Sequence, residues 1–471
     1  MKITNLKHWI LLLLLLTIAT ITYSFINPKE QLQEIPPPID EIQQRGSLQK
    51  RNITFSTSFE NNYYTNKMRE GYFYAEVRAG KYRNDHATES PLNISLVIDR
   101  SGSMRGDKIY NAKNAAKYII DQLNENDYVS IVIYDDEIDV LQEATHPFNK
   151  RAIKQKIDAI KERASTNLMG GAEAGYRQVK RNYNDRYINR VLLLSDGMAN
   201  AGITNPREIN HIIRNHNNND GITISTFGLG IDYNEDLMTS IAETGMGNYY
   251  FINHSEDIAS IFSKELNGLK EVVAQNVELS IQLPENLKIE RVYGANYDIV
   301  GGKLRINLRD IFSEETKGVL VKYTLQGVQY KPLSIQSSLT YIDVEKEKQE
   351  YISLRSIMNY TDDERLFHKN YNEWVSTQVT LNISNEKLEE AMREVDRGNY
   401  QKAKQLVKEN DEYISSKEDL VNKSAELQKV KSTNNSYTSN INAAPTMNES
   451  ELKTLQKSRK NEIYQIRAKK N

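Results

Sequence analysis

From Pro91 onwards, short apolar segments alternate with segments whose apolar residues have helical spacing. Leu92–Ile98 and Tyr128–Tyr134 have the composition of strands, and Val191–Leu194 is apolar without interruption. An unbroken apolar strand is typical of a parallel sheet that helices cover on both faces. Strand–helix alternation therefore predicts a doubly wound, mostly parallel sheet, and we expect this α/β domain to cover residues 91–268.

Apolar and polar residues alternate with a period of two on both sides of this domain, in residues 51–90 and again from Val277 to Tyr341. This period is typical of half-buried strands, and several such strands at short spacing predict a small antiparallel β-sandwich. The strands before Pro91 are too few to bury a core of their own. We therefore expect them to join the later strands, which makes the α/β domain an insertion in the sandwich.

The last region of the chain is predicted to be helical. Residues 350–430 contain Leu388–Val395 and Ala403–Val407, which we expect to form two helices around a turn at Gly398. One such hairpin is too little for a repeat array. The following segment is rich in Ser, Thr and Asn and is interpreted as a flexible linker, followed by a charged helix or tail.

The N-terminus has the order of a secretory signal, with two early lysines followed by an apolar run from Trp9 to Ile26. This run is also long enough for a retained single-span anchor, and both alternatives stay open. Either way, the positive-inside rule places the rest of the chain outside the cytoplasm. We therefore expect an exported protein that is periplasmic, at the cell surface or held to the membrane only by this segment. The predicted organisation is a signal peptide or anchor (1–26), a linker (27–50), an N-terminal sandwich segment (51–90), the α/β domain (91–268), a C-terminal sandwich segment (269–349), a helical region (350–430), a flexible linker (431–450) and a charged helix or tail (451–471).

Composition excludes several classes of function. Lys plus Arg number 61 and Asp plus Glu 63, and this balance argues against a protein that binds nucleic acid by neutralising phosphates. The chain has no cysteine, which excludes disulfides, thiolate metal sites and a cysteine nucleophile. Its seven histidines lack the spacing of metal ligands, so a metal site would have to use oxygen ligands.

Three loops of the α/β domain carry hydroxyl and carboxylate side chains. The first predicted strand ends in Asp99-Arg100-Ser101-Gly102-Ser103, Thr166 precedes a predicted helix, and Asp196 follows another buried strand. Ligands of open α/β sheets bind at the carboxyl ends of the strands, and a hard divalent cation prefers oxygen ligands. The first motif alone also fits a helix N-cap, so the prediction depends on all three loops. The predicted metal site consists of Asp99, Ser101, Ser103, Thr166 and Asp196.

In order and context, these motifs resemble the metal-ion-dependent adhesion site of the von Willebrand factor type A family. The resemblance covers residues 91–268, and the wider arrangement is similar to exported bacterial proteins of the inter-alpha-trypsin-inhibitor heavy-chain kind. It implies that Ser101, Ser103 and Thr166 ligate a metal, while Asp99 and Asp196 act mainly through water. The implied ion is Mg²⁺, with Mn²⁺ and Ca²⁺ as open alternatives.

The expected function is binding. A metal without a directly bound carboxylate keeps much of its positive charge, so we expect a protein partner that presents Asp or Glu to the open position. No nucleophile or general base is predicted beside the site, so we do not expect an enzyme. Asp135 and Asp136, which follow the second strand, are interpreted first as solvated loop charges and second as contacts for the partner. The alternative function is a membrane-anchored structural or assembly factor of the cell envelope. The sequence leaves the partner and the oligomeric state open.

Overall fold

The computed structural model describes residues 46–467 except 82–89, 164, 198, 232, 255, 328 and 329. The predicted signal peptide or anchor and most of the first predicted linker therefore lie outside the described residues. Within the described residues, we find no helix with the length and apolar character needed to cross a membrane.

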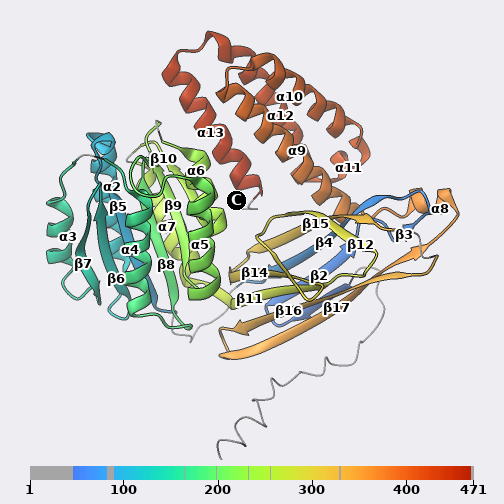
Figure 1. Cartoon of the computed structure of the whole chain (residues 1–471), viewed down its shortest axis with the longest axis horizontal. Coiled ribbons are helices and arrows are strands. Elements are labelled where there is room, and N and C mark those ends of the chain that lie inside the picture. Colours follow the sequence, from blue (N-terminus) through green and yellow to red (C-terminus); the bar gives the residue numbers. More distant parts are fainter. Residues whose placement is uncertain are drawn as a thin grey trace, which may run out of the picture. The chain divides into compact units, whose positions relative to one another are not determined.

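The predicted α/β domain is built on one mixed sheet (Figure 1). Its strands pair in the order β10-β9-β8-β5-β6-β7, all parallel except β7, which runs antiparallel to β6. The strands are β5 (Leu92–Asp99), β6 (Tyr128–Tyr134), β7 (Ile138–Thr145), β8 (Ile188–Ser195), β9 (Thr223–Leu229) and β10 (Met246–Ile252). The doubly wound, mostly parallel fold is thus confirmed, but the edge strand β7 was not predicted. Its side chains are exposed or half-buried, so its sequence lacks the apolar run of a central strand.

Helices cover both faces of this sheet. Ile94, Leu96 and Ile98 of β5 belong to the core on one face, together with residues of α2 and α7, whereas Val97 belongs to the core beneath α4, α5 and α6. These opposite directions follow from the two-residue period of a strand. The helices are α2 (Asp107–Gln122), α3 (Lys150–Asp158), α4 (Leu168–Arg181), α5 (Pro206–Asp220), α6 (Glu235–Thr244) and α7 (Asp257–Lys270).

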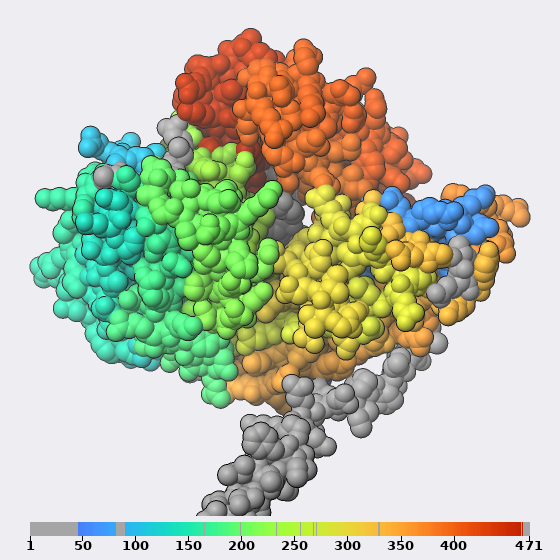
Figure 2. Space-filling view, viewed as in Figure 1, coloured from blue at the N-terminus to red at the C-terminus, as the bar shows by residue number. Residues whose placement is uncertain are grey.

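The strands before and after the α/β domain form a two-sheet sandwich. One sheet has the order β1-β2-β4-β15-β12, and Val77 of β4 pairs with Lys317 of β15. Figure 1 shows this as blue strands beside yellow ones, and blue atoms border yellow and orange ones in the space-filling view (Figure 2). The predicted insertion in a sandwich is therefore confirmed. This sheet contains β1 (Gly46–Lys50), β2 (Ile53–Phe59), β4 (Glu70–Ala79), β12 (Leu287–Tyr293) and β15 (Thr316–Leu325).

The second sheet of the sandwich has the order β13-β14-β11-β16-β17-β3. Its strands are β3 (Tyr63–Tyr64), β11 (Val272–Gln282), β13 (Asp298–Val300), β14 (Lys303–Phe312), β16 (Leu333–Asp343) and β17 (Lys348–Tyr360). Two predicted boundaries were wrong. Gly46–Lys50 is the edge strand β1 and not linker, and residues 350–360 belong to β17 and not to the helical region. In β17 the buried Ile352, Leu354 and Met358 lie on the core face, two or four residues apart, as a strand requires.

The C-terminal region is helical, as predicted. Its helices are α8 (Glu364–Lys369), α9 (Glu373–Asp396), α10 (Tyr400–Ser415), α11 (Glu418–Lys423), α12 (Ala425–Ala443) and α13 (Glu449–Arg467). The predicted flexible linker at 431–450 was wrong, because most of it belongs to α12 and the start of α13. The buried residues Leu427, Val430, Tyr437 and Ile441 have helical spacing, and the buried Asn434 lies on the same face between them. Asn410 of α10 donates to Asn434 Oδ1 at 2.9 Å, so this polar residue is satisfied inside the bundle.

Candidate metal site

Asp99 lies at the carboxyl end of the central strand β5 and is fully buried. Its Oδ1 accepts the backbone N–H of Ser101 at 2.9 Å. Its Oδ2 accepts the hydroxyls of Ser195 at 2.6 Å and Tyr134 at 3.3 Å. Burial, together with the nearby charge of Asp196, raises the pKa of the Asp99 carboxyl to about 6, although the hydrogen bonds from Ser101 and Ser195 lower it. The carboxylate is therefore fixed in position and lies close to a second carboxylate.

The two serines of the first loop lie side by side. The Oγ atoms of Ser101 and Ser103 are 3.0 Å apart, and a short 3₁₀ turn, Gly102–Met104, follows Ser101. Met104 is completely buried and anchors this turn in the core beneath α2. Ser101 is buried and Ser103 is exposed, so an ion bound by both hydroxyls would lie at the surface of the domain. Two adjacent hydroxyl oxygens can ligate a single ion.

Thr166 and Asp196 come from loops that are tied together. The backbone carbonyl of Thr166 accepts the N–H groups of Asn200 and Ala201 at 3.1 Å, and its own N–H donates to Asn200 Oδ1 at 2.8 Å. Asn200 and Ala201 follow Asp196 in the loop after β8. The structure thus places the five predicted residues in three loops at one edge of the sheet.

Asp196 is fully buried, and its two oxygens differ in environment. Lys108 Nζ lies 3.0 Å from Oδ2. Oδ1 has no hydrogen-bond partner among the described residues, although a buried carboxylate oxygen normally has one. A cation or its bound water would satisfy this oxygen. Serine and threonine hydroxyls and two carboxylates are a suitable donor set for Mg²⁺ or a similar hard ion. The residues present therefore fit the implied metal.

The interpretation of Asp135 as a solvated charge was wrong. Its carboxylate is fully buried and forms ion pairs with Arg100 Nε at 2.9 Å and Arg163 Nε at 3.2 Å. Arg163 N–H also donates to the carbonyl of Arg100 at 2.8 Å, and Asn167 N–H donates to the carbonyl of Asp135. Asp135 therefore holds the first loop against the loop that carries Thr166. Asp136 is exposed, as expected.

Sequence reasoning missed Lys108, although it contained a usable signal. Lys108 is in the first turn of α2, where the helix dipole disfavours a positive charge. A lysine at such a position needs a nearby anion, and Asp196 supplies it. The ion pair between Lys108 and Asp196 could not be predicted from local sequence, because α2 and β8 are far apart in the chain and meet only in the folded domain.

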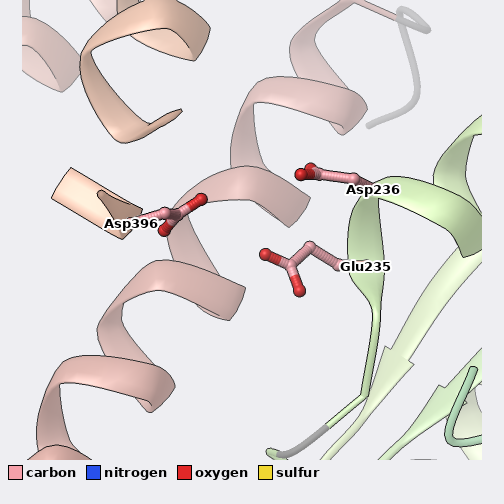
Figure 3. Close-up of side chains that lie close together, drawn as sticks. All are labelled: Glu235, Asp236 and Asp396. Atoms are coloured by element: carbon pink, nitrogen blue, oxygen red, sulfur yellow. The ribbon is translucent and has the colours of Figure 1, made fainter. Parts of the chain in front are cut away.

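A second acidic cluster lies near this edge (Figure 3), at the start of α6, where Asn234 N–H donates to the backbone carbonyl of Asp196 at 3.2 Å. Asp396 of α9 faces Glu235 and Asp236 at the start of α6. Lys457 and Lys460 of α13 balance these charges. Lys457 forms an ion pair with Glu235, and Lys460 pairs with Glu235, Asp236 and Asp396 at 2.5, 3.2 and 2.6 Å. The cluster therefore joins three helices through lysines.

Comparison with known proteins supports the interpretation of the α/β domain. The family model of the von Willebrand factor type A domain matches residues 93–264. The chain is 32% identical over 192 residues to an uncharacterized protein of Escherichia coli, YfbK, covering 40% of this chain and 33% of the relative. It is 28% identical over 246 residues to inter-alpha-trypsin inhibitor heavy chain H3 of Rattus norvegicus, covering 48% of this chain and 27% of the relative. The aligned region is thus about a third or less of these relatives.

Two solved structures share the fold at low sequence identity. A von Willebrand factor type A protein from Catenulispora acidiphila is 15% identical, with a TM-score of 0.62 over 77% of this chain and 89% of that chain. The ArnB paralog VWA2 from Sulfolobus acidocaldarius is 18% identical, with a TM-score of 0.59 over 86% of this chain and 98% of that chain. The likeness therefore extends well beyond the α/β domain.

Proposed function

Because residues 93–264 are a von Willebrand factor type A domain, a kind that commonly mediates protein–protein interaction, we propose that this domain binds a protein partner through a divalent metal ion. Ser101, Ser103 and Thr166 would ligate the metal, and Asp99 and Asp196 would act mainly through bound water. Mg²⁺ is the ion we propose, and Mn²⁺ and Ca²⁺ are the alternatives. The partner would present an Asp or Glu side chain to the open position.

One observation carries this proposal. The paired hydroxyls of Ser101 and Ser103 lie next to two fully buried carboxylates, and one Asp196 oxygen has no partner among the described residues. Buried carboxylates are costly unless they are paired with positive charge or coordinate a metal. A bound metal would supply an electrophilic centre that attracts a carboxylate from outside.

The residues of the chain have separate tasks in this proposal. The hydrogen bonds from Ser101 N–H, Ser195 and Tyr134 keep Asp99 oriented, so little ordering is needed when a cation binds. The ion pairs of Asp135 fix the first two loops relative to each other. A site built for binding needs no general base, and we propose that the protein is not an enzyme.

The N-terminal run from Trp9 to Ile26 supports export as an element of the proposal. If the segment is cleaved, the protein acts as a released binder. If it is retained, the protein acts as a membrane-anchored structural or assembly factor of the cell envelope. Sequencing the mature N-terminus after cell fractionation distinguishes these functions, because a start near Phe25 supports only the first.

The metal site is tested by titrating the full chain with Mg²⁺ in a calorimeter. Asp99→Asn keeps the size of the side chain but removes its charge, and Ser103→Ala removes one exposed hydroxyl that the fold does not need. Both variants should lose Mg²⁺ binding while keeping the wild-type circular dichroism spectrum. Asp158→Asn is the matched control, because this exposed carboxylate pairs with Lys117 far from the site. Unchanged Mg²⁺ affinity in Asp99→Asn and Ser103→Ala would refute the assignment.

A further inference from the structure

Lys108 is a positioned residue and not a freely solvated surface lysine. Its side chain is only 18% exposed, and its Nζ lies 3.0 Å from Asp196 Oδ2. Its stem crosses Gly230 at the end of β9, where an added Cβ would lie 2.8 Å from Lys108 Cε. Gly230 also has a positive φ of 76° that favours glycine. The fold therefore leaves space for the lysine to reach the metal-site carboxylate.

The position of Lys108 is not explained by the stability of its helix. A positive charge in the first turn of α2 opposes the helix dipole. The compensating interaction is the ion pair with Asp196, which is itself fully buried. The ion pair with Asp196, in the loop after β8, therefore explains why a lysine stands at this position.

We propose that the Lys108 ammonium competes with the metal for Asp196 and so sets the affinity of the site for metal. This inference rests on the proposed function. Both cations are attracted to the same carboxylate and repel each other across a few ångströms of partly buried space, where charges interact more strongly than in water. Lys108 therefore lowers the affinity for Mg²⁺ alone.

The same charge favours an acidic partner. Two carboxylates, Asp99 and Asp196, neutralise a divalent ion, and Lys108 then leaves one positive charge in excess. A carboxylate from the partner restores neutrality. Metal and acidic partner should consequently strengthen each other's binding, as linked ligands do.

The experiment compares Mg²⁺ affinity in wild type, Lys108→Met, Lys108→Arg and Lys117→Met by calorimetry on the full chain. Lys108→Met should bind Mg²⁺ about tenfold more tightly, a change of about 1.4 kcal/mol. Lys108→Arg, which keeps the charge, should stay near wild type. Lys117→Met is the control, because Lys117 is on the same helix but pairs with Asp158.

A second measurement keeps the inference falsifiable if Lys108→Met folds less well. In EDTA this variant should melt at a lower temperature than wild type, since Asp196 has lost its counter-charge, and saturating Mg²⁺ should close that gap. In saturating Mg²⁺, a blocked peptide with one aspartate should bind Lys108→Met more weakly than wild type.

The outcomes separate the two proposals. If wild type binds no Mg²⁺, the proposed function fails, and this inference fails with it. If wild type binds Mg²⁺ but Lys108→Met binds it equally or more weakly, or the melting gap persists in Mg²⁺, only the competition by Lys108 is refuted.

Discussion

Lys457 of α13 is the residue whose removal should most directly loosen the C-terminal helix from the type A domain. Its ammonium is buried, forms an ion pair with Glu235, donates to the backbone carbonyl of Tyr233 and lies 4.5 Å from the centre of the Tyr233 ring. Lys457→Met keeps most of the apolar stem but removes the charge.

The expected cost follows from what is left behind. Removing one partner of a buried ion pair typically costs about 3–5 kcal/mol, because the other charge stays uncompensated. Glu235 keeps Lys460 at 2.5 Å, which offsets roughly half of that cost. The lost hydrogen bond to Tyr233 adds about 1 kcal/mol. We therefore expect the free energy of opening α13 to fall by about 2.5–3.5 kcal/mol.

Hydrogen exchange of the backbone amides of α13, read by mass spectrometry, is the appropriate assay because it reports local opening. A change of about 2.5–3.5 kcal/mol corresponds to exchange about 60- to 320-fold faster. Lys453→Met is the matched control on the same helix, since Lys453 pairs with the exposed Glu449. Equal exchange in Lys457→Met and Lys453→Met would show that the ion pair does not hold α13, and the reasoning would be refuted.

Three further predictions concern single side chains. Burial raises the pKa of Glu60 to about 7, so the folded state binds an extra proton between about pH 4.5 and 7 and loses stability as pH rises through this window. Glu60→Gln should therefore be more stable than wild type at pH 8, by at most about 3 kcal/mol, and equal to it at pH 4 in urea unfolding; a pH-independent difference would contradict this. Asp135→Asn should destabilise the type A domain by about 3 kcal/mol because Arg100 loses its buried partner, and an unchanged urea midpoint would argue against it. Tyr464→Phe should cost about 1–2 kcal/mol, because the Tyr249 N–H donates to the Tyr464 hydroxyl at 3.0 Å in a buried contact; hydrogen exchange at Tyr249 that matches wild type would exclude this role.

The sequence predicted elements whose pattern is set locally and missed those set by tertiary partners. The apolar run of β8 and the alternation along β11 were sufficient to place a parallel sheet and a sandwich. By contrast, residues 431–450 were interpreted as a flexible linker because they are rich in Ser, Thr and Asn. Buried bonds of Asn434 with Asn410 and with the carbonyl of Val407 make one of these polar residues part of the core.

The candidate site follows the same rule. Asp99, Ser101, Ser103, Thr166 and Asp196 could be proposed because each stands at a strand or helix end that sequence pattern reveals. The roles of Asp135 and Lys108 depend on which loops meet in space, and a charged residue after a strand has the same sequence signature whether it is buried or solvated. The burial of Asp135 could have been predicted only if Arg100 and Arg163 had been recognised as its ion-pair partners.

The pairing of Val77 with Lys317 has a consequence for the order of folding. About 240 residues separate these neighbours in the sheet, and a ribosome adds roughly 5–20 residues per second, so β2 and β4 are made some 10–50 s before β15, the strand that pairs with the free edge of β4. The type A domain between them pairs its strands only among themselves and can fold during that interval. Until β15 arrives, β4 presents an unpaired apolar edge of the kind that promotes aggregation. Chaperone demand during synthesis should therefore centre on residues 53–79, although the function is expected to reside elsewhere.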